Sequence, residues 1–292
     1  MSSRGPLDID ALADLALDTA RAAADLVRER AAAGVAVAAT KSSEVDVVTQ
    51  ADRDSEALIR RLIGEVRPSD AFLGEEGGAT GGAGDAGDAG DAGSAAVRWI
   101  VDPIDGTVNF LYGLPEFSIS IAAEVDGVLS VGVVLNVATG TAYRARRGAA
   151  GLQAEVLDGP GQRIGVRAPV PLSQQLVITG FSYDADVRRQ QAAALVSLLP
   201  RVRDIRRHGS AALELCKIAV GQADAYVEVG VNLWDYAAGA LIAEAAGARW
   251  EVLPGLAGRD LVVCAPAASF DDVRDLALDA GFGAGSGTGS RP

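Results

Sequence analysis

The first part of the chain carries apolar residues at helical spacing in two segments. Over residues 8–30, apolar side chains recur on one stripe and acids and arginines on the other, which predicts an amphipathic helix. A second helix is predicted over residues 50–66, whose apolar side chains also share one face. Thr49 precedes this helix and Asp52 follows three residues later. That spacing is typical of a capping box, so we expect the helix to begin there.

Short apolar runs separated by turn residues follow. Strands are predicted over 97–101 and 117–125, and as a pair within 127–143 around a turn at Thr139-Gly140. Consecutive strands joined by tight turns favour antiparallel pairing. Farther along, strands and helices alternate, which favours an α/β layer. The strands are predicted at 176–179, 225–229 and 261–265, and the helices at 187–199, 210–220 and 236–246.

These patterns divide the chain into three parts. We expect an N-terminal α+β subdomain with an antiparallel sheet over 1–150 and a C-terminal α/β subdomain over 151–280. Residues 281–292, rich in glycine and serine, predict a disordered tail. Residues 77–96 contain a repeated Gly-Asp-Ala unit with little apolar area to bury, and predict a mobile surface loop.

Composition narrows the class of protein. Of 292 residues, 49% are hydrophobic, which is enough for a large core. The 26 basic residues against 39 acidic ones give a net charge of −13, and the densest basic stretch, 201–207, is short, so we expect no direct nucleic-acid partner. Two cysteines and one histidine argue against a disulfide framework, a zinc site and a Ser-His-Asp triad. The N-terminus lacks an apolar signal core and no run is long enough for a membrane helix, which predicts a soluble, cytoplasmic protein.

The segment 99–110 carries the strongest chemical signal. A predicted strand ends in Asp102 and Asp105, Gly106 permits a tight turn, and Thr107 can cap a following helix. Two carboxylates beside a helix N-terminus can hold a divalent cation and an anion together. Taken alone, the segment is equally consistent with an Asp-rich turn.

Acids in three other segments extend this signal. Glu75 and Glu76 follow a short strand, Asp235 stands at the start of a predicted helix, and Asp52 lies in the capping box. Each has an ordinary structural explanation, as a solvated turn or a helix cap. If Glu75, Asp102, Asp105 and Asp235 converge at about 5 Å, each pair of like charges costs roughly 3 kcal/mol at an effective dielectric of about 20, so cations or large pKa shifts are required. Carboxylates without histidine or cysteine select Mg²⁺, Mn²⁺ or Ca²⁺.

Four segments occur together in the order of a known family. They are Asp46-Val47-Val48-Thr49-Gln50-Ala51-Asp52, Gly74-Glu75-Glu76, Asp102-Pro103-Ile104-Asp105-Gly106-Thr107-Val108-Asn109-Phe110 and Trp234-Asp235-Tyr236-Ala237-Ala238-Gly239. The chain closely resembles the inositol monophosphatases, within the superfamily of lithium-sensitive, Mg²⁺-dependent sugar phosphatases, and looks most like the bacterial, actinobacterial branch. The resemblance covers residues 41–247. It implies a layered αβαβα sandwich, a homodimer, inhibition by lithium, and two or three Mg²⁺ ions that Mn²⁺ can replace.

The resemblance also implies a role for each site residue. The metal ligands are Glu75, Asp102, the carbonyl of Ile104, Asp105 and Asp235. The amides of Gly106 and Thr107 form the phosphate cradle, and Thr107 and Asp52 help to activate the attacking water. Glu228 binds a substrate hydroxyl, Lys41 lies near the metal, and the helix start that lines the substrate pocket is formed by Gly209, Ser210 and Ala211.

The reaction implied is hydrolysis of inositol 1-phosphate and similar small polyol monophosphates by a metal-activated water. Histidinol phosphate, fructose 1,6-bisphosphate and 3′-phosphoadenosine 5′-phosphate remain alternative substrates, and a non-catalytic regulatory binding role remains an alternative function. Departures from the family pattern are the long loop after Glu76, Tyr226-Val227 in place of a double tyrosine before Glu228, and His208 just before Gly209.

Overall fold

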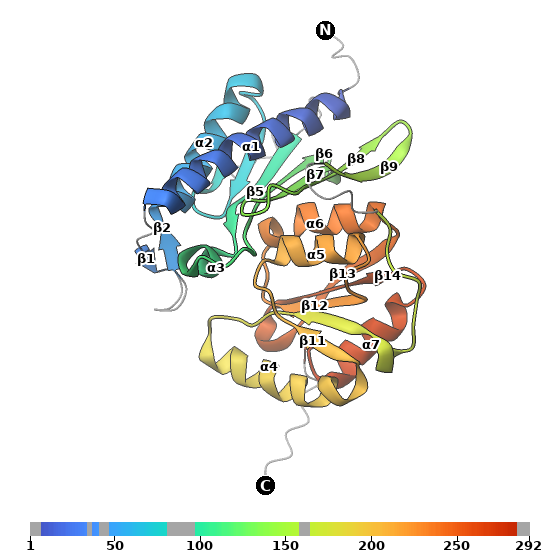
Figure 1. Ribbon diagram of the computed structural model, residues 1–292. Coiled ribbons are helices and arrows are strands. Elements are labelled where there is room, and N and C mark those ends of the chain that lie inside the picture. The colour runs from blue at the N-terminus through green and yellow to red at the C-terminus, as the bar shows by residue number, and fades with distance from the viewer. Residues whose placement is uncertain (1–6, 34–36, 41–46, 81–96, 158–163, 285–292) are drawn as a thin grey trace, which may run out of the picture.

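The computed structural model describes residues 7–33, 37–40, 47–80, 97–157 and 164–284. Two sheets alternate with three layers of helices, so the structure confirms the predicted αβαβα sandwich (Figure 1). Several predicted features lie outside the described residues: Lys41, Asp46, residues 81–96 of the predicted loop, and residues 285–292 of the predicted tail.

The first sheet has seven strands in the order β4-β3-β5-β6-β7-β8-β9. Its neighbours pair antiparallel, except that β3 and β5 run parallel, which differs from the wholly antiparallel sheet that was expected. Because parallel strands end at the same edge, this exception brings Glu75 beside the end of β5. The strands are β3 Ala71–Gly74, β4 Gly78–Thr80, β5 Val97–Asp105, β6 Ser118–Val125, β7 Val128–Asn136, β8 Ala142–Gly148 and β9 Gly151–Val156.

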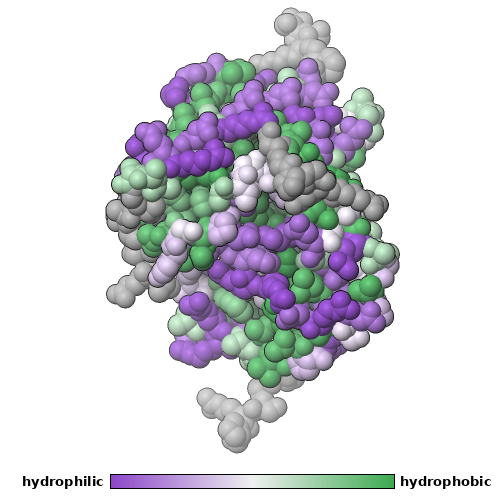
Figure 2. Space-filling view, viewed as in Figure 1, coloured by the Kyte–Doolittle hydropathy of each residue, from purple (hydrophilic) through white to green (hydrophobic). Residues whose placement is uncertain are grey.

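Helices cover both faces of this sheet. Helices α1 (Ile9–Ala33) and α2 (Gln50–Val66) pack on one face, and α5 (Ala211–Ala219) and α6 (Leu233–Ala245) pack on the other. The solvent side of α1 is hydrophilic, as the sequence pattern predicted (Figure 2). The short helix α3 (Thr107–Tyr112) follows β5, and a two-stranded sheet of β1 (Val37–Thr40) and β2 (Val47–Thr49) precedes α2.

The second sheet has five strands in the order β11-β10-β12-β14-β13. Strand β10 pairs parallel with β11 and β12, whereas β14 pairs antiparallel with β12 and β13. Helices α5 and α6 lie against one face, and α4 (Ala185–Leu198) and α7 (Phe270–Ala280) form the last layer. The strands are β10 Leu176–Thr179, β11 Asp204–Arg206, β12 Ala225–Val229, β13 Ala248–Pro254 and β14 Asp260–Pro266, and single 3₁₀ turns lie at Leu172–Gln174, Leu199–Arg201 and Leu256–Gly258.

Alternation along the strands builds three hydrophobic cores. In β12, Val227 packs in the core between this sheet and helices α4 and α7. The preceding residue, Tyr226, packs on the opposite face, in the core formed with α5 and α6. In β5, Trp99 packs under α1 and α2, and Ile100 packs on the opposite side of the sheet. Successive side chains of a strand point to opposite faces, so each strand contributes to two layers.

Most predicted elements are confirmed within a few residues, and the differences have physical reasons. The helix predicted over 50–66 is α2, with both capping-box bonds between Thr49 and Asp52. Helix α6 begins at Leu233, three residues before its predicted start, because Asn232 rather than Asp235 is its N-cap. Strand β4 falls within the predicted loop 77–96, where pairing with β3 supplies the order that composition does not. Strands β1, β2, β9, β11 and β13 and helix α7 were not predicted.

The first sheet extends past the predicted boundary at residue 150. Strand β9, Gly151–Val156, pairs with β8 over its whole length. The division into 1–150 and 151–280 stays a prediction, but a boundary drawn by sheets falls after β9. Within the described ranges, no helix combines the length and the apolar character needed to cross a bilayer.

Candidate active site

Most of the predicted site residues line one pocket of about 320 Å³. Its wall is formed by both halves of the molecule, the first half being the chain up to the end of β9 and the second half the chain after it. Two predicted members lie behind its wall instead: Asp52 and Ser210 are buried and contact residues that line it. The lining includes Glu75, Asp102, Ile104, Asp105, Gly106, Thr107, Gly209, Ala211, Glu228 and Asp235.

The end of β5 is irregular, and this irregularity presents its two aspartates. Asp102 pairs with Ser120 and Asp105 pairs with Ser118. Between these two pairs, β5 contains one residue more than β6, which is a β-bulge. Such a bulge bends a strand and re-aims its side chains. Gly106 then adopts φ 92°, and a Cβ there would lie 2.8 Å from the carbonyl oxygen of Glu116. Only glycine satisfies both conditions, as the sequence predicted.

Asp105 is held by the other half of the molecule. The Ser210 hydroxyl donates to its Oδ2 at 2.6 Å, the Ala212 amide to Oδ2 at 2.8 Å, and the Ala211 amide to Oδ1 at 3.2 Å. These donors form the N-terminus of α5, where a carboxylate is stabilised. Ser210 therefore contacts Asp105 rather than lining the pocket. Burial nevertheless raises the pKa of Asp105 to about 7.

Several acids of the pocket are buried close to one another, and this raises their pKa values. Burial raises the pKa of Asp102 well above its ordinary value, and Glu75, Asp105 and Asp235 raise it further. The pKa of Asp235 is also raised well above its ordinary value, first by burial and then by Glu75 and Asp105. The neighbours that act most strongly on Asp102 are thus all carboxylates, which is the environment of a divalent cation and oxygen ligands.

The same acids do not yet stand in the arrangement of a bound ion. Within the part of the chain that the structure describes, no three acidic, histidine or cysteine side chains have the geometry of a metal site. Binding of a cation would draw these carboxylates together, with the Ile104 carbonyl as a further oxygen at the pocket wall. The donors are carboxylate and carbonyl oxygens, which fit Mg²⁺ in chemistry.

Thr107 connects the pocket to the buried Asp52. Its hydroxyl lies 3.1 Å from Asp52 Oδ1 and 3.0 Å from the Ile104 carbonyl. Asp52 also accepts the Thr49 amide at 2.8 Å, and burial raises its pKa. The expectation that Thr107 caps α3 is wrong, because Gly106 occupies the cap position and the Thr107 side chain turns to Asp52.

Glu228 enters the pocket from β12 of the second sheet. The Tyr226 hydroxyl donates to its Oε2 at 2.9 Å. Burial, with Glu214 adding to it, raises the pKa of Glu228 to about 8. A Cβ on Gly180 would lie 1.9 Å from the Glu228 carboxylate. Gly180 was not predicted as a site residue, and its position directly after β10 was the available signal.

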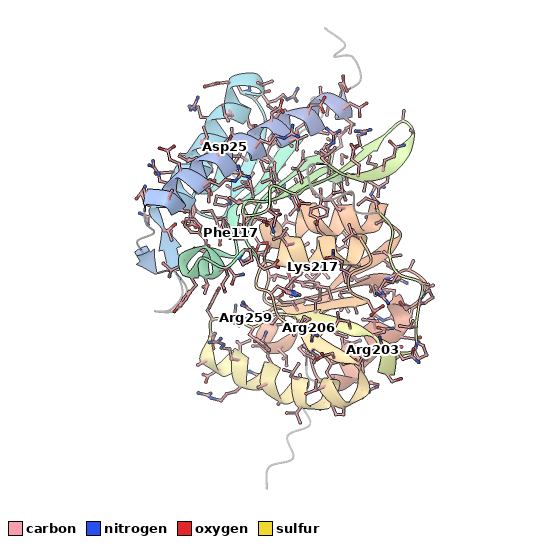
Figure 3. The ribbon with its side chains drawn as sticks, in the orientation of Figure 1. Asp25, Phe117, Arg203, Arg206, Lys217 and Arg259 are labelled. Carbon is pink, nitrogen blue, oxygen red and sulfur yellow. The ribbon has the colours of Figure 1, made fainter. Side chains whose placement is uncertain are left out.

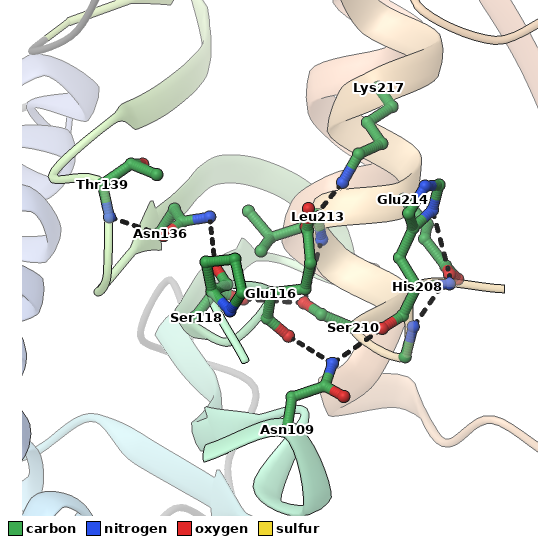
Figure 4. Close-up of polar contacts among 12 residues, drawn as sticks. Asn109, Glu116, Ser118, Asn136, Thr139, His208, Ser210, Leu213, Glu214 and Lys217 are labelled. Atoms are coloured by element: carbon green, nitrogen blue, oxygen red, sulfur yellow. Dashed lines mark hydrogen bonds and ion pairs between the residues drawn. The ribbon is translucent and has the colours of Figure 1, made fainter. Parts of the chain in front are cut away.

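A network of polar groups joins the two halves beside the pocket (Figure 4). The Asn109 amide donates at 2.7 Å to the carbonyl of Glu116 and at 2.7 Å to that of His208. Glu214 Oε1 accepts the amides of His208 at 2.7 Å and Gly209 at 3.1 Å. Sequence reasoning missed Glu214, although an acid within an apolar helix was a signal.

Two arginines of the pocket were also missed. Arg207 and Arg259 line the pocket together with the acids. Arg207 belongs to the basic stretch 201–207. Arg259, which is labelled in Figure 3, directly precedes β14. His208, which was noted as flanking the pocket, does not line it; its Nδ1 lies 3.7 Å from Glu214 Oε1.

Comparisons with known proteins assign the chain to a family. The profile of the inositol monophosphatase family matches residues 8–268. An inositol-1-monophosphatase of Mycobacterium leprae is 50% identical over 218 residues, which are 74% of this chain and 72% of that protein. A Nus factor SuhB of Pasteurella multocida is 37% identical over 209 residues, 71% of this chain and 72% of that protein.

A solved structure shows the same fold. The structure of Mycobacterium tuberculosis SuhB superposes with a TM-score of 0.76 and 38% identity, covering 94% of this chain and 98% of that one. The relatives share most of their length with this chain, and the family profile spans helices α1 to α6, both sheets and the whole pocket. The chain is therefore a member of the inositol monophosphatase family.

Proposed function

We propose that the protein is a Mg²⁺-dependent phosphomonoesterase that hydrolyses inositol 1-phosphate and related small polyol monophosphates. The observation that carries this proposal is the convergence of Glu75, Asp102, Asp105 and Asp235 on one pocket. A pocket of buried carboxylates repels a phosphate unless cations reverse its charge. The name of the M. leprae relative supports the choice of substrate.

The ligands proposed for two or three Mg²⁺ ions are Glu75, Asp102, the Ile104 carbonyl, Asp105 and Asp235. Mn²⁺ has the same preference for oxygen ligands and can replace Mg²⁺. When bound, the ions supply Lewis-acid polarisation of the phosphate and a lowered pKa for water.

The chain's own residues then position the reactants and hold protons. The amides of Gly106 and Thr107 at the start of α3 have no helical acceptor and can donate to phosphate oxygens. The Thr107 hydroxyl, 3.1 Å from Asp52 Oδ1, accepts a hydrogen bond from the attacking water while it donates to Asp52. Burial raises the pKa of Asp52, so this carboxylate can take up a proton as the water is deprotonated.

The polyol is oriented by the second half of the molecule. Glu228 is an acceptor for a substrate hydroxyl, and Tyr226 fixes its rotamer through the bond to Oε2. Gly209 and Ala211 supply a narrow wall at the start of α5 where a larger side chain would obstruct the ring.

The test is phosphate release from inositol 1-phosphate, histidinol phosphate, fructose 1,6-bisphosphate and 3′-phosphoadenosine 5′-phosphate, with and without Mg²⁺. We expect Mg²⁺-dependent turnover that is fastest with inositol 1-phosphate, and its loss in Asp102→Asn. Faster turnover of another substrate would retain the reaction and replace the substrate. No release from any of the four would refute the proposal.

Lithium inhibition, a homodimer and a cytoplasmic location are proposed from the family resemblance. Lithium should compete for one Mg²⁺ position, so its inhibition should weaken as Mg²⁺ is raised. Activity that is insensitive to excess LiCl would contradict this. Sedimentation of the full chain measures the oligomeric state.

The alternative function, a regulatory binding role, is favoured by one observation: the P. multocida relative is named Nus factor SuhB. If this chain has a comparable role, a metal-site variant should retain it. Asp102→Asn should then lose phosphatase activity and still bind the purified protein partner. Loss of both in a folded variant would tie the two roles to one site.

A further inference from the structure

The pocket combines an acidic wall with two guanidinium groups, and the proposed mechanism uses only the acids. Arg207 follows the edge strand β11, and Arg259 lies in the turn before β14. Cations and the hydroxyls of a polyol do not require positive charges, which oppose cation binding, although Arg207 lowers the pKa of Glu228 at longer range. Guanidinium groups instead select carboxylates and phosphates.

Arg207 lies against the turn that starts α5. A Cβ on Gly209 would stand 2.4 Å from Arg207 Nη1, so the guanidinium packs over the bare α-carbon of that glycine. Among the described residues, no carboxylate lies within 4.0 Å of this guanidinium, and Glu228 acts on it only at longer range. An arginine that is placed in a pocket without an ion-pair partner has donors available for a ligand.

Arg259 makes only a weak ion pair. Its Nη2 lies 3.8 Å from Asp184 Oδ2, and 41% of its side chain is exposed. An exposed pair at this distance contributes little, so the guanidinium can turn to an anion in the pocket. Its Cδ lies 3.2 Å from the position of a Cβ on Gly230, which keeps the side chain at the end of β12.

The position of these arginines relative to the predicted phosphate cradle sets the size of the ligand. The Gly209 carbonyl oxygen lies 3.1 Å from the position of a Cβ on Gly106, and the other side of Gly209 carries Arg207. Gly209 therefore lies between the predicted cradle and the guanidinium. All of these groups line one pocket, whose volume of about 320 Å³ accommodates a small sugar or polyol.

We infer that Arg207 and Arg259 form a second anion subsite, so that, between two sugar or polyol phosphates of the same skeleton, this enzyme prefers the one that carries a further phosphate or carboxylate group. The inference rests on the proposed phosphatase function and specifies its substrate class.

The neighbouring Arg206 offers a matched control. It stands next to Arg207 on the chain, pairs with Asp204 at 2.6 Å and does not line the pocket. Adjacent residues of an extended segment point in opposite directions, which accounts for the difference. A charge removed at Arg206 changes the net charge as much as one removed at Arg207 and leaves the subsite intact.

The experiment compares kcat/KM for matched substrates with Mg²⁺ present. Fructose 1-phosphate is compared with fructose 1,6-bisphosphate for a second phosphate, and glycerol 1-phosphate with 3-phosphoglycerate for a carboxylate. We expect the wild type to favour at least one doubly anionic member, and each of Arg207→Gln and Arg259→Gln to reduce that preference about tenfold, as for loss of a charge-assisted hydrogen bond. Arg206→Gln should retain the wild-type preference.

Three outcomes overturn the inference: a wild type without preference, an equal loss for both members of a pair in Arg207→Gln, or the same loss in Arg206→Gln. An equal loss would assign Arg207 to the reacting phosphate. Each of these outcomes leaves the proposed phosphatase function standing, because singly anionic substrates are still hydrolysed. No Mg²⁺-dependent release from any substrate would overturn both proposals. Thermal unfolding of each variant confirms that it is folded.

Discussion

Replacement of Asn109 by alanine tests whether the joint between the two halves controls the site. Asn109 is 4% exposed and donates to two carbonyls, that of Glu116 in the first half and that of His208 in the second. The His208 carbonyl belongs to the turn that leads to Ser210, which in turn bonds Asp105. Without the Asn109 side-chain amide, no hydrogen bond of this network joins the turn at His208 to α3.

The cost can be worked from these contacts. Each of the two hydrogen bonds contributes about 0.5–1.5 kcal/mol, and stranding two part-buried carbonyls adds to this, so the expected loss of unfolding free energy is about 2–4 kcal/mol. For a chain of 292 residues, the unfolding entropy is about 0.6 kcal/mol per kelvin. A loss of ~3 kcal/mol therefore lowers Tm by about 5 °C. Because the turn that holds Asp105 loosens, kcat/KM should also fall, by about tenfold or more.

Asn136 supplies the matched control. It is 8% exposed, donates to the Pro115 carbonyl at 3.1 Å and accepts the Thr139 amide at 2.9 Å. Both partners belong to the first half, so Asn136→Ala should cost comparable stability and leave kcat/KM close to the wild type (Figure 4). The assays are urea or thermal unfolding and phosphate release at a temperature where both variants are folded. Equal kcat/KM in the two variants would refute the reasoning.

Three further predictions concern the same pocket. Gly209→Ala should lower Tm, because residue 209 has φ 97° and the added Cβ would meet Arg207 and the Asn109 amide; an unchanged Tm would contradict this. Asp235→Asn should stabilise the metal-free protein by about 1–3 kcal/mol, since it removes one of several like charges, and should shrink the rise in Tm on adding Mg²⁺. The folded pKa values of Asp105, about 7, and Glu228, about 8, lie above their ordinary values, so the metal-free folded protein holds more protons than the unfolded chain between about pH 4 and pH 8. In EDTA its stability should fall as pH rises through that window and level off above it, whereas Tm that rises from pH 5 to pH 8 would oppose these pKa values.

Periodicity was sufficient for elements whose pattern is local. Helix α2 was predicted from its apolar face and its cap, and β10 and β12 from short apolar runs bounded by turn residues. Strand β9 was missed because its side chains are half-buried or exposed and carry no clear alternation. Helix α6 was begun too late because both Asn232 and Asp235 are good capping residues, and only the observed backbone decides between them.

In the site too, local features were predicted from the sequence and long-range ones were not. Its acids were identified one by one, yet their convergence needed a family resemblance, because Asp105 and Ser210 are separated by 105 positions and no local pattern relates them. The resemblance placed ten residues in the pocket wall but carried no information on Arg207 or Arg259, which lie outside its motifs. Gly180 was missed as well, because only the fold brings the Glu228 carboxylate against its α-carbon and leaves no room for a side chain.

The carboxylate of Asp105 lies under the start of α5, and this arrangement bears on the order in which the molecule assembles. The acid comes from the first sheet and its three donors come from a helix about a hundred residues later, so neither half alone can present it. The closure of so long a loop costs entropy that only docking of the halves recovers. If the protein binds Mg²⁺ here, we expect the competent site to require docking of the two halves. In native-state hydrogen exchange, the ion should slow the amides of Ala211 and Ala212 more than those of α1, because it stabilises the docked state selectively.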